Sequence, residues 1–190
     1  SIDKNRNLTV QKLKLPETYG NQSDTQPTAD DIKVHQIQYT YNEDGNLSKV
    51  SYPTTKDGIQ SLSYIYDENG WLQEIEGELH SKGQTTEKVL RSYTYDTFGR
   101  LVKTVTTDYK KNDQTKTITY TYDNVGNRLK EDDGTTTTSY TYNGLDQLKT
   151  STKEKGTAVE EVRQYDYDAN GNQTDVKNTK TGEDQIFAYD

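Results

Sequence analysis

The chain has 190 residues, a net charge of -8 at pH 7 and no cysteine. The acidic balance argues against binding to a phosphate backbone, and the lack of cysteine excludes disulfides and thiolate metal sites. Leu, Ile, Val and Phe together supply only 32 residues, which is typical of disordered chains, whereas tyrosine alone supplies 16. A fold therefore requires the tyrosine rings to gather on one side of a regular structure.

Residues 1–33 lack the pattern that fills the rest of the chain. Residues 21–31 are polar and include Pro27, which is typical of a linker, and residues 8–15 predict one edge strand. We therefore expect a lead-in over residues 1–33 and a repeat domain over residues 34–190. Because the chain begins at Ser1 and contains no methionine, we also expect it to be a piece of a longer protein.

From residue 34 onward, tyrosines occur in pairs separated by one residue. Successive pairs are 25, 29, 27, 20 and 25 residues apart, which is typical of an array built from one supersecondary unit. Because residues i and i+2 of a β-strand point to the same face, each pair predicts a strand with two rings side by side. The pairs are Tyr39 and Tyr41, Tyr64 and Tyr66, Tyr93 and Tyr95, Tyr120 and Tyr122, Tyr140 and Tyr142, and Tyr165 and Tyr167, and a truncated seventh unit begins at Phe187.

Each pair is followed by a turn signal. Asp or Asn comes first, then two variable residues and then glycine, as in a hairpin made of a type I turn and a left-handed residue. The fifth unit has Asp in the glycine position, where we expect a turn of altered geometry. The turn residues are Asn42 and Gly45, Asp67 and Gly70, Asp96 and Gly99, Asp123 and Gly126, Asn143 and Asp146, and Asp168 and Gly171. The prediction is an all-β fold of antiparallel hairpins in a spiralling open sheet.

The alternation along each strand assigns the two faces of the sheet. The tyrosine face forms the expected core and includes Ile37, Leu62 and Ile118, which lie two residues before a pair. After each turn the chain is expected to return through a leucine: Leu47, Leu72, Leu101, Leu129 or Leu148. Arg91 and Arg163 lie two residues before a tyrosine pair, so each is predicted to lie over a ring. Threonines such as Thr40, Thr94, Thr119 and Thr121 occupy the opposite, solvent-facing side.

The motif from Tyr93 to Leu101, Tyr-Thr-Tyr-Asp-Thr-Phe-Gly-Arg-Leu, resembles the YD repeats of the Rhs family, as does Tyr122 to Arg128. The resemblance covers about residues 34–190. It implies a sheet that spirals into a hollow shell. In bacterial members such shells enclose a C-terminal toxin in secreted, wall-associated or toxin-complex proteins, and in teneurins the shell belongs to a cell-surface adhesion protein.

This resemblance implies that the chain is a non-enzymatic wall segment without a cofactor. Its implied partner is a passenger or toxin domain of the same parent chain, and its implied location is secreted or on the cell surface. The family's closing segment, with its Asp-Pro motif and self-cleaving aspartates, has no counterpart in these residues. The truncated seventh unit also predicts a strand edge that pairs with a second copy.

Other readings of the same residues remain open. The tyrosines suggest a cell-wall glycan-binding module, although such modules depend on tryptophan and this chain has only Trp71. Asp168 to Asn172 resembles a calcium loop, but Thr179 stands where a bidentate Glu is needed. His35 and His80 form no metal-binding pattern. The carboxylate pairs Glu160-Glu161 and Asp132-Asp133 are expected to be solvated rather than a glycosidase pair.

Overall fold

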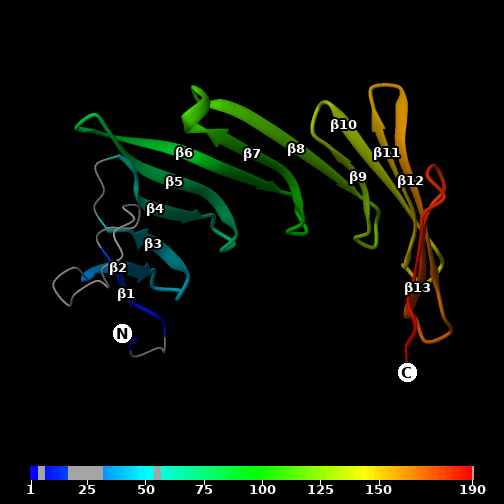
Figure 1. Ribbon diagram of the computed structural model, residues 1–190, viewed down its shortest axis with the longest axis horizontal. Helices are drawn as coiled ribbons and strands as arrows, with labels where there is room; N and C mark the ends of the chain where they lie inside the picture. The colour runs from blue at the N-terminus through cyan, green and yellow to red at the C-terminus, as the bar shows by residue number, and fades with distance from the viewer. Residues whose placement is uncertain (4–6, 17–31, 54–56, 190) are drawn as a thin grey trace, which may run out of the picture. The chain divides into compact units, whose positions relative to one another are not determined.

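Figure 1 shows a computed structural model of the chain, which describes residues 1–3, 7–16, 32–53 and 57–189. The linker expected over residues 21–31 lies outside the described residues. The chain divides into two compact units, Ser1–Ser92 and Tyr93–Asp190. No helix in the described ranges is long and apolar enough to cross a membrane.

The first unit is an antiparallel meander in which strands follow one another in chain order. The segment before the first tyrosine pair contributes a strand to this sheet, because Val10 to Pro16 pairs with Gln38 to Ile32. The strands are β1 (Val10–Pro16), β2 (Ile32–Tyr41), β3 (Leu47–Ser51), β4 (Gly58–Tyr66), β5 (Leu72–Ser81) and β6 (Gln84–Tyr95), the last of which ends in the second unit.

The second unit continues in the same manner, and its described residues include one short 3-10 helix, η2 (Tyr109–Lys111). The fold is thus all-β and antiparallel, as the tyrosine spacing and turn signals predicted. The strands are β7 (Leu101–Asp108), β8 (Gln114–Tyr122), β9 (Arg128–Asp132), β10 (Thr136–Tyr142), β11 (Leu148–Lys155), β12 (Ala158–Tyr167), β13 (Gln173–Asn178) and β14 (Asp184–Ile186).

The two faces of the strands differ in exposure as the sequence predicted. In β8 and β10 every tyrosine of a pair is half-buried, whereas Thr119, Thr121 and Thr141 between or beside them are exposed. A one-residue shift in register would exchange these two sets, because side chains alternate between faces. The alternation of half-buried tyrosine and exposed threonine therefore fixes the register of these hairpins.

The expected tyrosine core is only partly correct. None of the described paired tyrosines is fully buried, and the buried apolar side chains among the described residues are Val50 and Leu79, both 5% exposed. An open single-layer sheet leaves one side of each ring to solvent, so the rings cover the sheet without forming a closed interior. The tyrosine face is a half-buried surface.

The buried side chains among the described residues, Val50, Leu79 and Ser61, lie in the first unit. Tyr39, Val50, Leu62 and Gly77 form one cross-strand row through β2, β3, β4 and β5. A Cβ atom built on Gly77 would lie 2.6 Å from Cδ1 of Leu90, so the leucine side chain lies directly over the glycine. Gly77 is thus the small residue that lets Leu90 pack onto the sheet.

Candidate functional site

The six motif turns share one set of backbone hydrogen bonds. The N–H of the Asp or Asn donates to the carbonyl of the residue after the left-handed position, at 2.8–2.9 Å. The N–H of the left-handed residue donates to the carbonyl of the same Asp or Asn, at 3.0–3.3 Å. The register shifts by one residue just before the second tyrosine in the hairpins that begin at β2, β4, β8, β10 and β12. The two turn bonds define the predicted type I turn followed by a left-handed residue, and the register shift is a separate β-bulge in the returning strand, where Leu129 is the extra residue of the fourth hairpin.

The Asp or Asn side chain closes every one of these turns. Its Oδ1 accepts the N–H of the residue four positions on, at 2.8–3.0 Å in all six units. Gly70 and Gly99 both have φ of 78°, as the turn requires. The side-chain cap explains why Asp or Asn is the residue type at this position.

Asp146, in the glycine position of the fifth turn, keeps the hydrogen-bond pattern of the other turns with a φ smaller than that of any of their glycines. Its φ is 59°, and its N–H donates to the Asn143 carbonyl at 3.1 Å, as glycine does in the other turns. Asp tolerates the left-handed region because its short polar side chain bonds locally. Here the carboxylate also accepts from Asn127 Nδ2 at 2.9 Å, which ties the turn to its predecessor.

The second tyrosine of a pair joins its hairpin to the preceding one. Its hydroxyl donates to a backbone carbonyl two residues after the left-handed position of the earlier turn. The bonds run from Tyr66 to Leu47, from Tyr122 to Leu101, from Tyr142 to Arg128 and from Tyr167 to Leu148, at 2.8–2.9 Å. Tyr41 donates instead to the Leu8 carbonyl at 3.0 Å, so the N-terminal segment supplies the acceptor for the first hairpin.

The residue directly after the left-handed position forms a second link between successive hairpins. Arg100 Nε binds Asp96 Oδ2 at 2.7 Å within its own turn, and its Nη1 donates to the Asp123 carbonyl of the next turn at 2.8 Å. Asn127 repeats this arrangement with Asp123 at 3.0 Å and Asp146 at 2.9 Å. Sequence analysis missed this position, although Arg, Asn or Gln occupies it in five of the six units.

Two arginines stack on rings of the tyrosine face, but they are not the two that the sequence suggested. The guanidinium of Arg100 lies 5.0 Å from the centroid of Tyr122, and that of Arg128 lies 4.9 Å from Tyr140 and 5.7 Å from Tyr120. Arg163 instead pairs with Glu161 at 2.7 Å. The predicted stacking of Arg91 and Arg163 is not among the cation–ring contacts of the described residues.

Arg128 takes the place of a returning leucine in the fourth hairpin. In the fourth hairpin, Tyr122 is in register with Arg128, as Tyr41 is with Leu47. Leu129 therefore lies on the opposite face and is 40% exposed. The arginine stem fills the place that leucine has elsewhere, and its head binds Glu131 at 3.1 Å.

The turn carboxylates are held in their ionised form. Hydrogen bonds from the Asn172 side chain and backbone lower the pKa of Asp168. For Asp96 and Asp123, partial desolvation raises the pKa, and the turn hydrogen bonds outweigh it, so that the net pKa of each is lowered. Lys116 and the backbone of Thr136 lower the pKa of Asp133, at the turn between β9 and β10, to about 2.

The tyrosine hydroxyls show the opposite shift. Burial raises the pKa of Tyr66, Tyr122, Tyr140, Tyr142 and Tyr167. Burial disfavours a phenolate, and a hydroxyl that donates to a carbonyl must keep its proton. These groups are therefore neutral donors at physiological pH.

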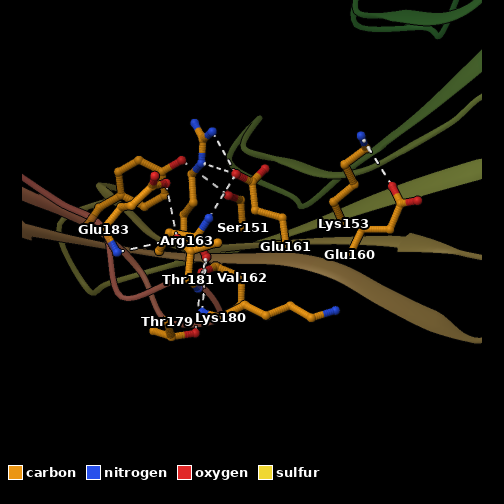
Figure 2. A network of polar contacts seen from close by, with 12 residues as sticks. Ser151, Lys153, Glu160, Glu161, Val162, Arg163, Thr179, Lys180, Thr181 and Glu183 are labelled. Atoms are coloured by element: carbon orange, nitrogen blue, oxygen red, sulfur yellow. Dashed lines mark hydrogen bonds and ion pairs between the residues drawn. The ribbon is translucent and has the colours of Figure 1, made fainter.

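The carboxylate pairs noted in the sequence are bound to cations. Figure 2 shows Glu160 beside Lys153, at 3.4 Å, and Glu161 beside Arg163. Asp132 and Asp133 bind separate lysines, Lys130 at 2.8 Å and Lys116 at 2.9 Å. A group of three or more His, Cys, Asp or Glu side chains placed to hold a metal does not occur within the described ranges. The distinctive chemistry of these residues is hydrogen bonding between repeats.

No family model matches the chain, and no curated protein matches it. Solved structures similar to it include the TcdB2-TccC3-Cdc42 complex, with a TM-score of 0.45, and TcdB2-TccC3 without the hypervariable C-terminal region, also 0.45. A third is the Tc holotoxin pore of Photorhabdus luminescens with a mutation in TccC3, with a TM-score of 0.44. In each case the identity is 18%, and the match covers 97% of this chain but 11% of the other.

Proposed function

We propose that this chain is a wall segment of a YD-repeat shell and that its role is structural. The observation that supports this proposal best is the bond from the second tyrosine to the carbonyl after the preceding turn, as from Tyr142 to Arg128. Both partners of that bond belong to the repeated motif. Each added hairpin therefore supplies the acceptor for the next, and the array extends through contacts between nearest neighbours.

We infer that the parent protein belongs to the Rhs family. The support is the recurrence of the tyrosine pair, the Asp or Asn cap and the left-handed residue in six consecutive hairpins. The proposed role of the wall is to enclose a passenger domain of the same parent chain, a toxin in the bacterial case. A secreted or cell-surface location and the lack of a catalytic centre are parts of this proposal.

Limited proteolysis of the full-length parent protein tests the enclosing role. Tyr122→Ala removes a half-buried ring and its bond to Leu101, so we expect passenger fragments to appear several-fold sooner than in the wild type. Thr121→Ala is the matched control, because Thr121 lies next to Tyr122 on the exposed face. Cleavage of the wild-type passenger at the pace of the isolated passenger would refute the role.

Tyrosine fluorescence of the 190-residue chain separates this proposal from the glycan-binding alternative. The hydroxyls of Tyr66, Tyr142 and Tyr167 donate to backbone carbonyls, which favours packing over an open stacking surface. We expect no saturable change when soluble peptidoglycan fragments are added. A saturable change would favour a glycan-binding module instead.

Association through a strand edge is a separate proposal. Within the described residues β14 pairs only with β13, and Ile186, the last residue of β14, is 81% exposed. We expect a second copy to pair with this edge, which sedimentation velocity would detect as reversible association between micromolar and millimolar concentration. Proline at Ala188 should weaken that association, and a strictly monomeric wild type would argue against it.

A further inference from the structure

One strand of the second unit has a free edge in the interior of the sheet. On one side, β8 pairs with β7 from Lys103 opposite Thr119 to Asp108 opposite Gln114. On its other side, the pairing with β9 stops at Thr119 opposite Asp132. Residues 114–118 therefore have ladder partners on one side only, among the described residues. Figure 1 shows β8 diverging from the β9–β10 hairpin in this part of the unit.

An open hollow of ≈ 900 Å³ lies along this free edge. It is lined by consecutive β8 residues, Gln114, Thr115, Lys116 and Thr117, whose side chains alternate between the two faces of the sheet. Because the hollow contacts side chains from both faces, it lies beside the edge of β8 rather than over one face of the sheet. We call it the β8 notch: the space beside Gln114 to Ile118, bounded across the gap by Thr136 and Lys155.

The notch presents backbone groups as well as side chains. In an antiparallel ladder, every second residue turns its N–H and C=O toward the same neighbour, so alternate residues of 114–118 point these groups into the notch. Five residues of strand extend about 17 Å, which is enough to pair with a short peptide. The notch thus provides a template for one additional strand.

The charges around the notch indicate the side chains that an added strand would carry. Lys116 is bound to Asp133 at 2.9 Å, and Lys111 to Asp108 at 3.8 Å. Lys155 lines the notch and takes part in none of the ion pairs of the described residues. The remaining lining is rich in threonine, with six threonine side chains. An acidic side chain would complement Lys155.

We propose that the β8 notch binds an extended peptide segment with an acidic side chain, which adds as an antiparallel strand beside Gln114 to Ile118. Peptides of this kind obtain their affinity from main-chain hydrogen bonds and their specificity from alternate side chains. The direction follows β9, which runs antiparallel to β8 up to Asp132 and ends there, where the chain turns into β10. This site is independent of the role as a shell wall.

The probe is an N-acetylated, C-amidated hexapeptide, Thr-Val-Glu-Val-Thr-Val, added to the 190-residue chain at up to about 1 mM. Amide hydrogen exchange, followed residue by residue by NMR, is the readout. In the free protein we expect alternate amides between residues 114 and 118 to exchange quickly. The peptide should slow those amides by about tenfold or more at saturation. If all five amides are protected without peptide, the edge is already covered and the proposal fails.

Two controls separate strand addition from non-specific binding. The first control is a pair of hexapeptides of the same sequence in which every second peptide nitrogen is methylated, one peptide for each of the two possible registers. Both keep the side chains but lose hydrogen-bond donors for the ladder. At least one of the two should fail to protect the amides of residues 114–118. Lys155 is exposed. Lys155→Glu should weaken binding of the acidic hexapeptide and strengthen binding of the same hexapeptide with Lys in place of Glu. Equal binding of the methylated and unmethylated peptides, or no protection by any peptide, would overturn the proposal.

Discussion

At the scale of single residues, the two tyrosines of a pair have different roles. The first directs its hydroxyl to side chains, as Tyr165 does to Ser151 at 3.2 Å, whereas the second donates to a backbone carbonyl of the preceding hairpin. A lost bond to a backbone carbonyl leaves a part-buried acceptor without its partner. The hydroxyl of the second tyrosine is therefore expected to contribute more to stability.

Tyr122→Phe tests this difference, because it removes the hydroxyl that binds the Leu101 carbonyl at 2.8 Å and keeps the ring. We expect the free energy of unfolding to fall by about 1 kcal/mol. Tyr120→Phe, in the same strand, should cost less than about 0.5 kcal/mol. Urea titration of the three proteins is the measurement, and equal losses would contradict the assigned roles.

The left-handed turn position is a second residue-scale feature. At Gly70 φ is 78°, and a Cβ atom built there meets nothing within 4 Å. Any loss of stability in Gly70→Ala therefore reflects the cost of a left-handed backbone conformation for alanine rather than a steric clash. We expect a loss of about 1–2 kcal/mol in urea titration. Asn69→Ala, at the exposed neighbouring position, should be nearly neutral, and a neutral Gly70→Ala would show that the turn tolerates a side chain.

At the scale of elements, packing between neighbouring strands depends on residues of matched size. Gly77 in β5 lies under Leu90 of β6, with 2.6 Å between its built Cβ and Cδ1 of Leu90. Overpacking such a contact forces a side chain or a strand to move. This pair is therefore expected to couple energetically.

A double-mutant cycle measures that coupling. Gly77→Ala should destabilise the protein by about 1–3 kcal/mol, because Leu90 must shift. In the Leu90→Ala background the same change should cost at least about 0.5 kcal/mol less, since the space above the glycine is then open. Denaturant unfolding of the four proteins gives the interaction energy, and strict additivity would mean that the two residues do not meet in solution.

The motif turns are elements whose stability depends on ionised carboxylates. The pKa of Asp168 is lowered in the folded protein, so its contribution is fully present above the unfolded value of 3.8 and is lost as the pH falls through the folded value. We expect the urea midpoint to decrease as the pH falls below about 4. Asp168→Asn keeps the cap, as Asn143 does in the fifth turn, and should make this decrease smaller. An unchanged acid dependence would argue against the turn carboxylate as its source.

At the scale of the whole molecule, the tyrosine hydroxyls link the protein's stability to alkaline pH. Their raised pKa values mean that the unfolded chain loses these protons first, near its ordinary value of 10.0. The stability they contribute is therefore complete below pH 10 and decreases as the pH rises through the folded values. Neutral tyrosine donors and ionised turn carboxylates together place the stability maximum between about pH 4 and pH 10.

Denaturant titration between pH 8 and pH 11, with tyrosinate absorbance as a second readout, tests this alkaline dependence. We expect the unfolding midpoint to fall above about pH 10 as phenolates form. The double variant Tyr122→Phe and Tyr142→Phe should have a lower midpoint at pH 8 but a flatter alkaline decrease, because two hydroxyls that bond to backbone are absent. Parallel decreases in variant and wild type would show that other groups dominate.

The sequence by itself determined the elements and their faces. Paired tyrosines two residues apart, with Asp or Asn and a left-handed residue after them, dictate a strand and a turn through local geometry alone. These signals need no distant partner, so the hairpins, the positive φ of Gly70 and Gly99, and the exposed threonines followed from the chain. The substitution of Asp146 for glycine was tolerable for the same local reason.

Only the tertiary structure decided how hairpins bond to one another. The hydroxyl of Tyr142 reaches the carbonyl of Arg128, and Arg100 reaches the turn at Asp123, because adjacent strands bring these atoms within hydrogen-bond distance. Sequence spacing does not encode that distance, which is why Arg91 and Arg163 were assigned the stacking that belongs to Arg100 and Arg128. The β8 notch has the same origin: it arises from the unequal lengths of β8 and β9 in the assembled sheet.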